Sequence, residues 1–137
     1  MSNTADMYAI MGFLVILLVI LLVVRRYRAK HLNTAYFTER WKELQKHCRT
    51  RKTWPLAVID ADNLLDEALR RSLHKGKTTG ERLVAAQHKL TSNETVWFGH
   101  KLRNKIASED VRKLKKQDIV GALAGFRQAL KDLGALE

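Results

Sequence analysis

Two charged residues in this sequence fall on helix faces that are otherwise apolar. At 100° per residue, Asp62 lies within the apolar stripe of a helix predicted from Trp54 to about Leu73, and Asp66 lies at its edge. Arg103 falls on the apolar arc of a later predicted helix. A buried charge is costly unless an opposite charge or several hydrogen bonds meet it. We therefore predict a partly buried ion pair between Arg103 and Asp62, with Asp66 as the alternative partner.

Two neighbours of Arg103 could also take part in a polar site. Asn104 follows it directly, and its hydrogen bonds could support the ion pair or reach the backbone. His100 lies three residues earlier and farther round the helix, where we expect it to pack against other side chains. The alternative for Arg103 is that its long side chain extends past its neighbours to solvent.

Four segments together resemble the HEPN superfamily of small helical bundles, in particular bacterial versions with one N-terminal membrane span. The segments are AVIDADNLLDEAL (57–69), TTGERL (78–83), VWFGHKLRNKIAS (96–108) and GFRQALKDLGAL (125–136). The resemblance extends over residues 40–137. It implies a helical bundle, and HEPN ribonucleases cleave RNA without metal by bringing together an Arg and a His from each of two subunits, usually within RNxxxH.

This sequence departs from that motif at the catalytic histidine. Arg103 and Asn104 match the start of the motif, but Ser108 occupies the position of the histidine. A serine hydroxyl does not exchange protons near pH 7 as imidazole does, and loss of a general acid or base costs about 100- to 10,000-fold in rate. We therefore assign no catalytic residue. The structural or ligand-binding candidates are Arg103, Asn104, Asp62, Asp66 and His100.

The apolar run from Met7 to Val24 determines where these residues can be. It holds eighteen consecutive uncharged residues, and a helix of that length spans about 27 Å, close to the hydrocarbon thickness of a bilayer. Thirteen of them are Leu, Ile, Val or Phe, which contribute roughly −4 to −8 kcal/mol on insertion scales. The run predicts a transmembrane helix after a short tail of residues 1–6, because a buried core helix is normally shorter or polar on one face.

The residues on either side of this run favour an uncleaved anchor over a secretory signal peptide. A signal peptide has basic residues before its apolar core and a small-residue cleavage site after it. Here the tail has no Lys or Arg, and four basic residues follow the run: Arg25, Arg26, Arg28 and Lys30. Because Lys and Arg beside a span stay on the cytoplasmic side, we predict a single-pass cell-membrane protein with its N-terminus outside and its C-terminal domain in the cytoplasm.

The chain after the run is strongly basic. It holds all 25 Lys and Arg residues and all but one of the 14 acidic residues, and the whole chain carries a net charge of +11. Anionic lipid attracts basic residues near the membrane surface by about 1 kcal/mol each. We predict lipid headgroup contacts for Arg25, Arg26, Arg28 and Lys30. RNA binding is the alternative explanation of the same charge.

The cysteine and histidine content limits redox and metal chemistry. A single cysteine, Cys48, excludes an intrachain disulfide and fits a reducing compartment. The histidines are scattered and form no metal-ligand spacing with it, so the sequence predicts neither a metal nor a cofactor.

Apolar residues at spacings of three and four predict an all-α fold after the span. We expect a basic juxtamembrane helix in residues 25–52 and a HEPN-like bundle of four or five helices in residues 53–137. We predict that helices start at N-caps Thr53, Thr78 (with Glu81) and Thr91 (with Glu94), and that one helix ends at Gly76.

Together these features predict a membrane-anchored, cytosolic helical binding module that is degenerate and non-catalytic. Its expected role is to dock a protein partner, or a second copy of itself, at the inner face of the membrane. The alternative is a membrane-tethered, metal-independent ribonuclease that uses Arg103 with His100, or an RNA-binding domain without catalysis.

Overall fold

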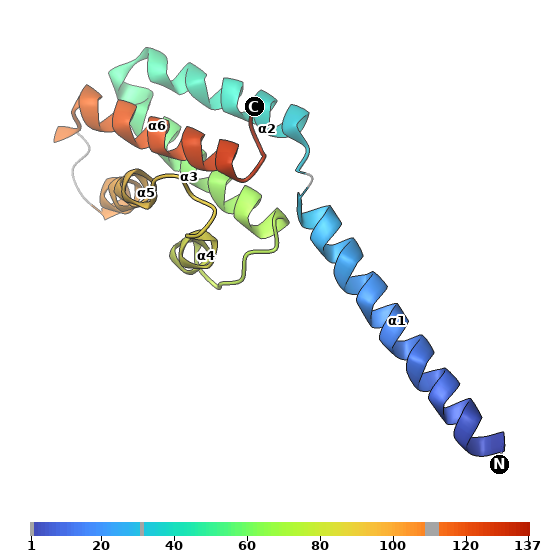
Figure 1. Ribbon diagram of the computed structural model, residues 1–137. Helices are drawn as coiled ribbons and strands as arrows, with labels where there is room; N and C mark the ends of the chain where they lie inside the picture. The colour runs from blue at the N-terminus through green and yellow to red at the C-terminus, as the bar shows by residue number, and fades with distance from the viewer. Residues whose placement is uncertain (1, 31, 109–112) are drawn as a thin grey trace. The chain divides into compact units, whose positions relative to one another are not determined.

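The computed structural model describes residues 2–30, 32–108 and 113–137, and these are helical with no strand (Figure 1). The elements are α1 (Ser2–Lys30), α2 (Thr34–Gln45), the 3-10 helices η1 (Lys46–Arg49) and η2 (Arg51–Thr53), α3 (Trp54–Arg71), α4 (Thr79–Ala86), α5 (Asn93–Ser108) and α6 (Lys116–Asp132). The chain divides into two compact units, Met1–His31 and Leu32–Glu137. The predicted all-α class is confirmed for the described residues.

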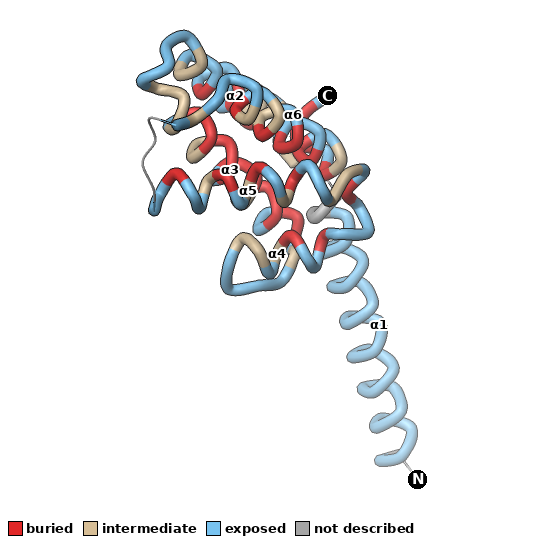
Figure 2. Tube along the Cα trace, turned by 90° about the vertical axis from the view of Figure 1, so that its left-hand side faces the viewer, coloured by how far each residue is buried: buried red, intermediate tan, exposed pale blue. Residues whose placement is uncertain are grey.

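The first unit is the single helix α1. Its segment Asn3–Tyr27 has 25 residues with a mean hydropathy of 3.1, and none of its most apolar stretch is buried (Figure 2). The helix extends beyond the predicted run of residues 7–24 at both ends, because neither the short tail nor the first basic residues contain a helix breaker. Arg25 and Arg26 are exposed on it, whereas the side chains of Arg28 and Lys30 lie outside the described residues.

Within the residues that the structure describes, the second unit is a bundle of five α-helices built around α3. This helix packs against α2, α4, α5 and α6, and Figure 2 shows buried positions along its length. Its apolar residues recur every three or four positions, so one broad face points into the core. The largest fully buried side chains are Phe37, Phe126, Leu65, Leu69, Leu83, Leu130, Val58 and Val96. This core lies entirely within the second unit.

Three large apolar side chains that recur with their neighbours at helical spacings are nevertheless exposed. Leu73 is 47% exposed, Phe98 43% and Val120 57%. Leu73 lies beyond the end of α3, so it no longer follows the helical wheel. Phe98 and Val120 lie on α5 and α6 at the margin of their buried faces, since an apolar stripe on a helical wheel is wider than the surface that a neighbouring helix covers.

The helix starts confirm one of the predicted caps and correct two. The Thr78 hydroxyl accepts a hydrogen bond from the Glu81 amide at 3.2 Å and begins α4 as expected. Thr53 directly precedes α3 but makes no side-chain capping hydrogen bond, and its hydroxyl donates to the carbonyl oxygen of His47 at 2.6 Å. Thr91 does not cap α5, because its amide and hydroxyl both donate to the Asp132 carboxylate at 2.7 Å.

The predicted stop at Gly76 is also wrong. Helix α3 ends earlier, where Leu73 adopts a left-handed backbone with φ of 62° and the His74 amide donates to the carbonyl oxygen of Leu69. Gly76 has a φ of 158° in the following loop, and a Cβ there would lie 2.8 Å from the Arg82 backbone nitrogen. The glycine is needed for this tight loop and not for the end of the helix.

Glycines allow α5 and α6 to approach closely. A Cβ at Gly99 would lie 2.8 Å from the Phe126 ring, and one at Gly125 would lie 2.6 Å from the backbone oxygen of Thr95. Gly121 and Gly125 lie one turn apart on α6, but they do not contribute equally to this close approach. Only Gly125 is required for it, since a Cβ at Gly121 would make an ordinary 3.6 Å contact with Phe98.

We expect Gly125→Ala to lower the free energy of unfolding by about 1–3 kcal/mol, because the added methyl group meets backbone that cannot move aside. Gly121→Ala is the matched control on the same helix, and its higher helix propensity should leave stability equal or raise it by up to about 1 kcal/mol. Urea unfolding of the full chain in neutral detergent, followed by circular dichroism, measures both. Equal stability of the two variants would contradict the close packing.

Candidate functional site

A buried carboxylate on α3 is the centre of the candidate site. The Asp62 side chain is only 3% exposed, because it lies among the buried apolar residues on the inner face of this helix. Its oxygen Oδ1 lies 2.8 Å from Nδ1 of His100, and its oxygen Oδ2 lies 3.6 Å from Nε of Arg103. His100 and Arg103 are three residues apart on α5, so both project from one face toward α3.

The structure brings Arg103 to Asp62, but the hydrogen bond comes from His100. At 3.6 Å the contact of Arg103 is an ion pair without a hydrogen bond, and within the described residues its Nε is buried with no hydrogen-bond partner. The Arg103 side chain is 35% exposed, whereas that of His100 is 12% exposed. His100 also packs edge-on against the Trp97 ring, with ring centroids 5.8 Å apart, so the expected packing is confirmed and the hydrogen bond to Asp62 is an additional contact.

Asn104 and Ser108 have local roles on α5. Asn104 accepts a hydrogen bond from Nη1 of Arg103 at 3.2 Å, so of its two expected roles it has the one that supports the guanidinium. The Ser108 hydroxyl donates to the carbonyl oxygen of Asn104 at 3.1 Å at the exposed end of the helix. The position that aligns with the catalytic histidine of the resembled motif is therefore engaged with the helix backbone.

A second carboxylate, one turn along α3, is paired with arginines. Asp66 accepts from Nε of Arg82 at 2.7 Å and from Nη2 at 3.1 Å, and Nε of Arg70 lies 3.2 Å away. Burial of the Asp66 carboxyl acts to raise its pKa, but the hydrogen bonds from Arg82 and Thr79 and the charges of Arg82 and Arg70 outweigh it and lower the pKa. Asp66 is therefore ionised at neutral pH. Its cationic partners are Arg82 and Arg70, so the alternative pairing of Asp66 with Arg103 is wrong.

Sequence reasoning missed Arg82 as a site residue. In addition to its bonds to Asp66, Arg82 donates from Nη1 to the carbonyl oxygen of Gly76 at 2.6 Å, so it also fixes the loop between α3 and α4. The available signal was Asp66 at the edge of an apolar stripe, because such a carboxylate needs a cation. Nothing in the local periodicity identifies which cation crosses the turn to reach it.

An open hollow of about 500 Å³ lies beside Asp62, between the start of α4 and α5, and we call it the α4–α5 hollow. It is lined by Asp62, Asn63, Lys77, Thr78, Thr79, Gly80, Arg82, His100, Arg103 and Asn104. A Cβ added at Gly80 would lie 3.9 Å from Nε2 of His100, so this imidazole nitrogen is on the side of the α4 start. The hollow therefore combines basic side chains with the first turn of a helix.

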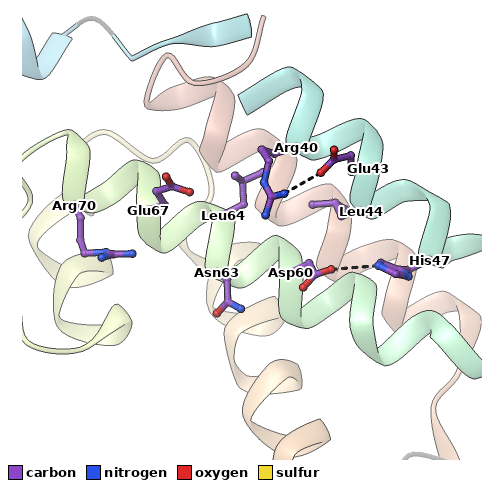
Figure 3. A pocket seen from close by; sticks show the side chains of 9 residues that line it. All are labelled: Arg40, Glu43, Leu44, His47, Asp60, Asn63, Leu64, Glu67 and Arg70. Carbon is purple, nitrogen blue, oxygen red and sulfur yellow. Dashed lines mark hydrogen bonds and ion pairs between the residues drawn. The ribbon is translucent and has the colours of Figure 1, made fainter. Parts of the chain in front are cut away.

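A second hollow of about 400 Å³ lies between α2 and α3 (Figure 3). Its lining contains both signs of charge, and opposite charges face one another in pairs. Arg40 lies 2.9 Å from Glu43, and His47 lies 3.4 Å from Asp60. The other two charged residues, Glu67 and Arg70, pair with Arg71 and Asp66 outside the lining, so each charge in this hollow already has a partner.

The described residues contain no group of three or more His, Cys, Asp and Glu side chains that could hold a metal ion. Cys48 is half-buried, and this burial raises the pKa of its thiol. A raised pKa leaves less of the reactive thiolate at neutral pH, so Cys48 has no features of a nucleophile.

The chain matches no protein-family description, no curated protein and no solved structure. Functional assignment therefore depends on the residues themselves.

Double-mutant cycles should separate the two partners of Asp62. We expect a coupling energy of about 1.5–3 kcal/mol between Asp62→Ala and His100→Ala, because that pair shares a buried, charged hydrogen bond. Between Asp62→Ala and Arg103→Ala we expect less than about 1 kcal/mol, because that contact is longer and partly solvated. Urea unfolding gives both values, and a larger coupling to Arg103 would reverse the assignment.

Proposed function

We propose that the protein is a membrane-anchored helical binding module. One observation carries this proposal: an apolar helix with an unburied surface precedes a bundle that has a complete core of its own. The exposed apolar surface of α1 would be strongly unfavourable in water, whereas a bilayer accommodates a helix of its length. The bundle needs nothing from α1 to bury its own apolar side chains.

The orientation of the anchor follows from its flanking charges. The basic residues lie only on the C-terminal side of the run, which favours a cytoplasmic bundle and an N-terminus outside. In that orientation Arg25, Arg26, Arg28 and Lys30 would lie at the inner surface, where anionic headgroups attract them. The module would thus present its hollows and exposed side chains to partners at the inner face of the membrane, including another copy of itself.

The contacts in the segment that resembles the ribonuclease motif, residues 103–108, fit a binding role better than a catalytic one. Ser108 bonds to the backbone and supplies no proton-transfer group. Arg103 and Asn104 hold one another, and Arg103 neutralises Asp62. These contacts support structural or ligand-binding roles for both residues.

The second candidate function is a metal-independent ribonuclease, related to the HEPN enzymes that the sequence resembles. One observation favours it: Asp62 occupies Nδ1 of His100, and this leaves Nε2 for proton transfer beside Arg103. A carboxylate that orients an imidazole in this way is a common arrangement for a general acid or base.

Membrane insertion is tested by placing two charges in the middle of α1. Leu17→Arg with Ile20→Arg adds about 5–7 kcal/mol to the insertion free energy, which offsets most of the gain from the apolar residues. We expect the wild-type chain to stay in membranes through alkaline extraction and the double variant to be released. Leu17→Val with Ile20→Val is the uncharged control and should stay.

Protease added outside intact cells should leave a C-terminal tag intact until the membrane is permeabilised. Release of the wild-type chain by alkali, or loss of the tag before permeabilisation, would contradict the anchor or its orientation respectively.

RNA cleavage distinguishes the two candidate functions. The full chain in neutral detergent is incubated with RNA and a metal chelator, and the binding module is expected to leave the RNA intact. A ribonuclease would cleave it and lose at least about 100-fold in rate in His100→Gln. Lys101→Gln on the same helix is the control, because Lys101 is exposed and lies outside the α4–α5 hollow.

A further inference from the structure

The α4–α5 hollow gathers basic groups from two separate segments. Lys77 comes from the loop before α4, and Arg103 and His100 come from α5. Lys77 is exposed, and its side chain is free to turn toward a ligand. Nη1 of Arg103 donates to Asn104, and its Nε lies near Asp62. Its Nη2 group is therefore available to a ligand in the hollow, which Arg103 lines.

The other charges around the hollow are compensated. Arg82 donates from Nε and Nη2 to Asp66 and from Nη1 to the Gly76 carbonyl oxygen, which uses three of its five N–H groups, so it contributes mainly positive potential. Asp62 is 3% exposed and faces His100 and Arg103, so its carboxylate is withdrawn from the opening. The Glu81 carboxylate lies nearby, where it accepts from the Lys77 amide at 2.6 Å. Among the charged residues that line the hollow, Lys77, Arg82 and Arg103 are basic and only Asp62 is acidic, so the lining is positive.

The first turn of α4 adds backbone donors. The amides of Thr79 and Gly80 have no acceptor within the helix, because the first N–H groups of any helix point out of it. Gly80 has no side chain over this turn. A Cβ there would lie 3.5 Å from the Trp97 ring and 3.9 Å from Nε2 of His100, so a methyl-sized gap separates this turn from the imidazole.

We propose that the α4–α5 hollow binds the phosphate group of a phosphomonoester. This deepens the binding-module proposal and depends on it for its biological setting, but the site stands on the bundle alone. The donors approach from two directions: an ammonium and the α4 amides on one side, and a guanidinium and an imidazole on the other. A tetrahedral dianion has oxygens for both sides, whereas a planar carboxylate satisfies one fork.

The same chemistry has two sources, a small soluble phosphate ester and a phospholipid headgroup with a terminal phosphate. The hollow of about 500 Å³ accepts the phosphate group of either. The α2–α3 hollow offers no comparable set of donors, since its basic side chains Arg40, His47 and Arg70 each lie beside a carboxylate (Figure 3).

The test titrates inorganic phosphate into the full chain in phosphatidylcholine nanodiscs and follows the backbone amide signals by NMR. We expect saturable shifts centred on Thr79 and Gly80. Lys77→Gln should weaken binding about tenfold, the loss of one good charged contact. Lys101→Gln, an exposed lysine on α5 outside the hollow, should bind like the wild type.

Two further variants separate binding from folding. Gly80→Ala introduces a methyl group that fits without a clash and stands beside Nε2 of His100, so it should weaken phosphate binding while the bundle stays folded. Arg103→Gln should weaken binding as well, and its amide spectrum and unfolding curve show whether it has folded. If Lys77→Gln and Lys101→Gln lose affinity equally, or if no signal saturates, the site is overturned.

The lipid source is distinguished by changing the nanodisc. Phosphatidic acid carries a phosphomonoester, and phosphatidylglycerol carries a phosphodiester that is also negatively charged. If the ligand is a headgroup, phosphatidic acid alone should shift Gly80 and suppress the titration with free phosphate. A chain that stays in membranes but fails to bind phosphate overturns this inference only, and a chain that binds phosphate but leaves the membrane overturns the anchor only.

Discussion

A carboxylate removed from water must be met by a cation or by several donors, and this constraint at Asp62 determines how α3 and α5 pack. Its burial costs several kcal/mol before any partner is counted. His100 and Arg103 reach it only because α5 crosses α3 with the face that carries both residues turned inward. A rotation of α5 by one residue would remove both partners and leave the charge uncompensated. The apolar contacts hold the two helices together, and the charge selects the face of α5 that contacts α3.

The same reasoning applies one turn further along α3. Asp66 holds Arg82, which belongs to α4 and also binds the loop that leads into it. Two carboxylates on one helix, four residues apart, thus fasten two different neighbours. The α4–α5 hollow lies between those neighbours, and its walls are the elements that the two carboxylates hold. Its basic lining includes Arg82, His100 and Arg103, which are partners in these same pairs.

Periodicity predicted the helices and the unusual position of Asp62, because both follow from residues close together in sequence. It did not predict that His100 is the closer partner, since the choice between His100 and Arg103 depends on the crossing of α3 and α5. The roles of Arg82 and Leu73 were missed for related reasons. The first depends on a contact across a loop, and the second on a left-handed backbone that glycine usually adopts. The cap at Thr78 was predictable because its partner is three residues away.

Stability alone does not account for charges in this position. Replacing a buried ion pair by apolar residues of similar volume is often neutral or stabilising, so an apolar contact between α3 and α5 would serve the fold as well. What an apolar pair would not provide is an oriented imidazole and a guanidinium with free donors at the edge of an open hollow. The Asp62 carboxylate holds both groups at a fixed place while it stays out of the opening. The cost of burying it is thus offset by the pair, and the positive groups that it orients remain available to an anion.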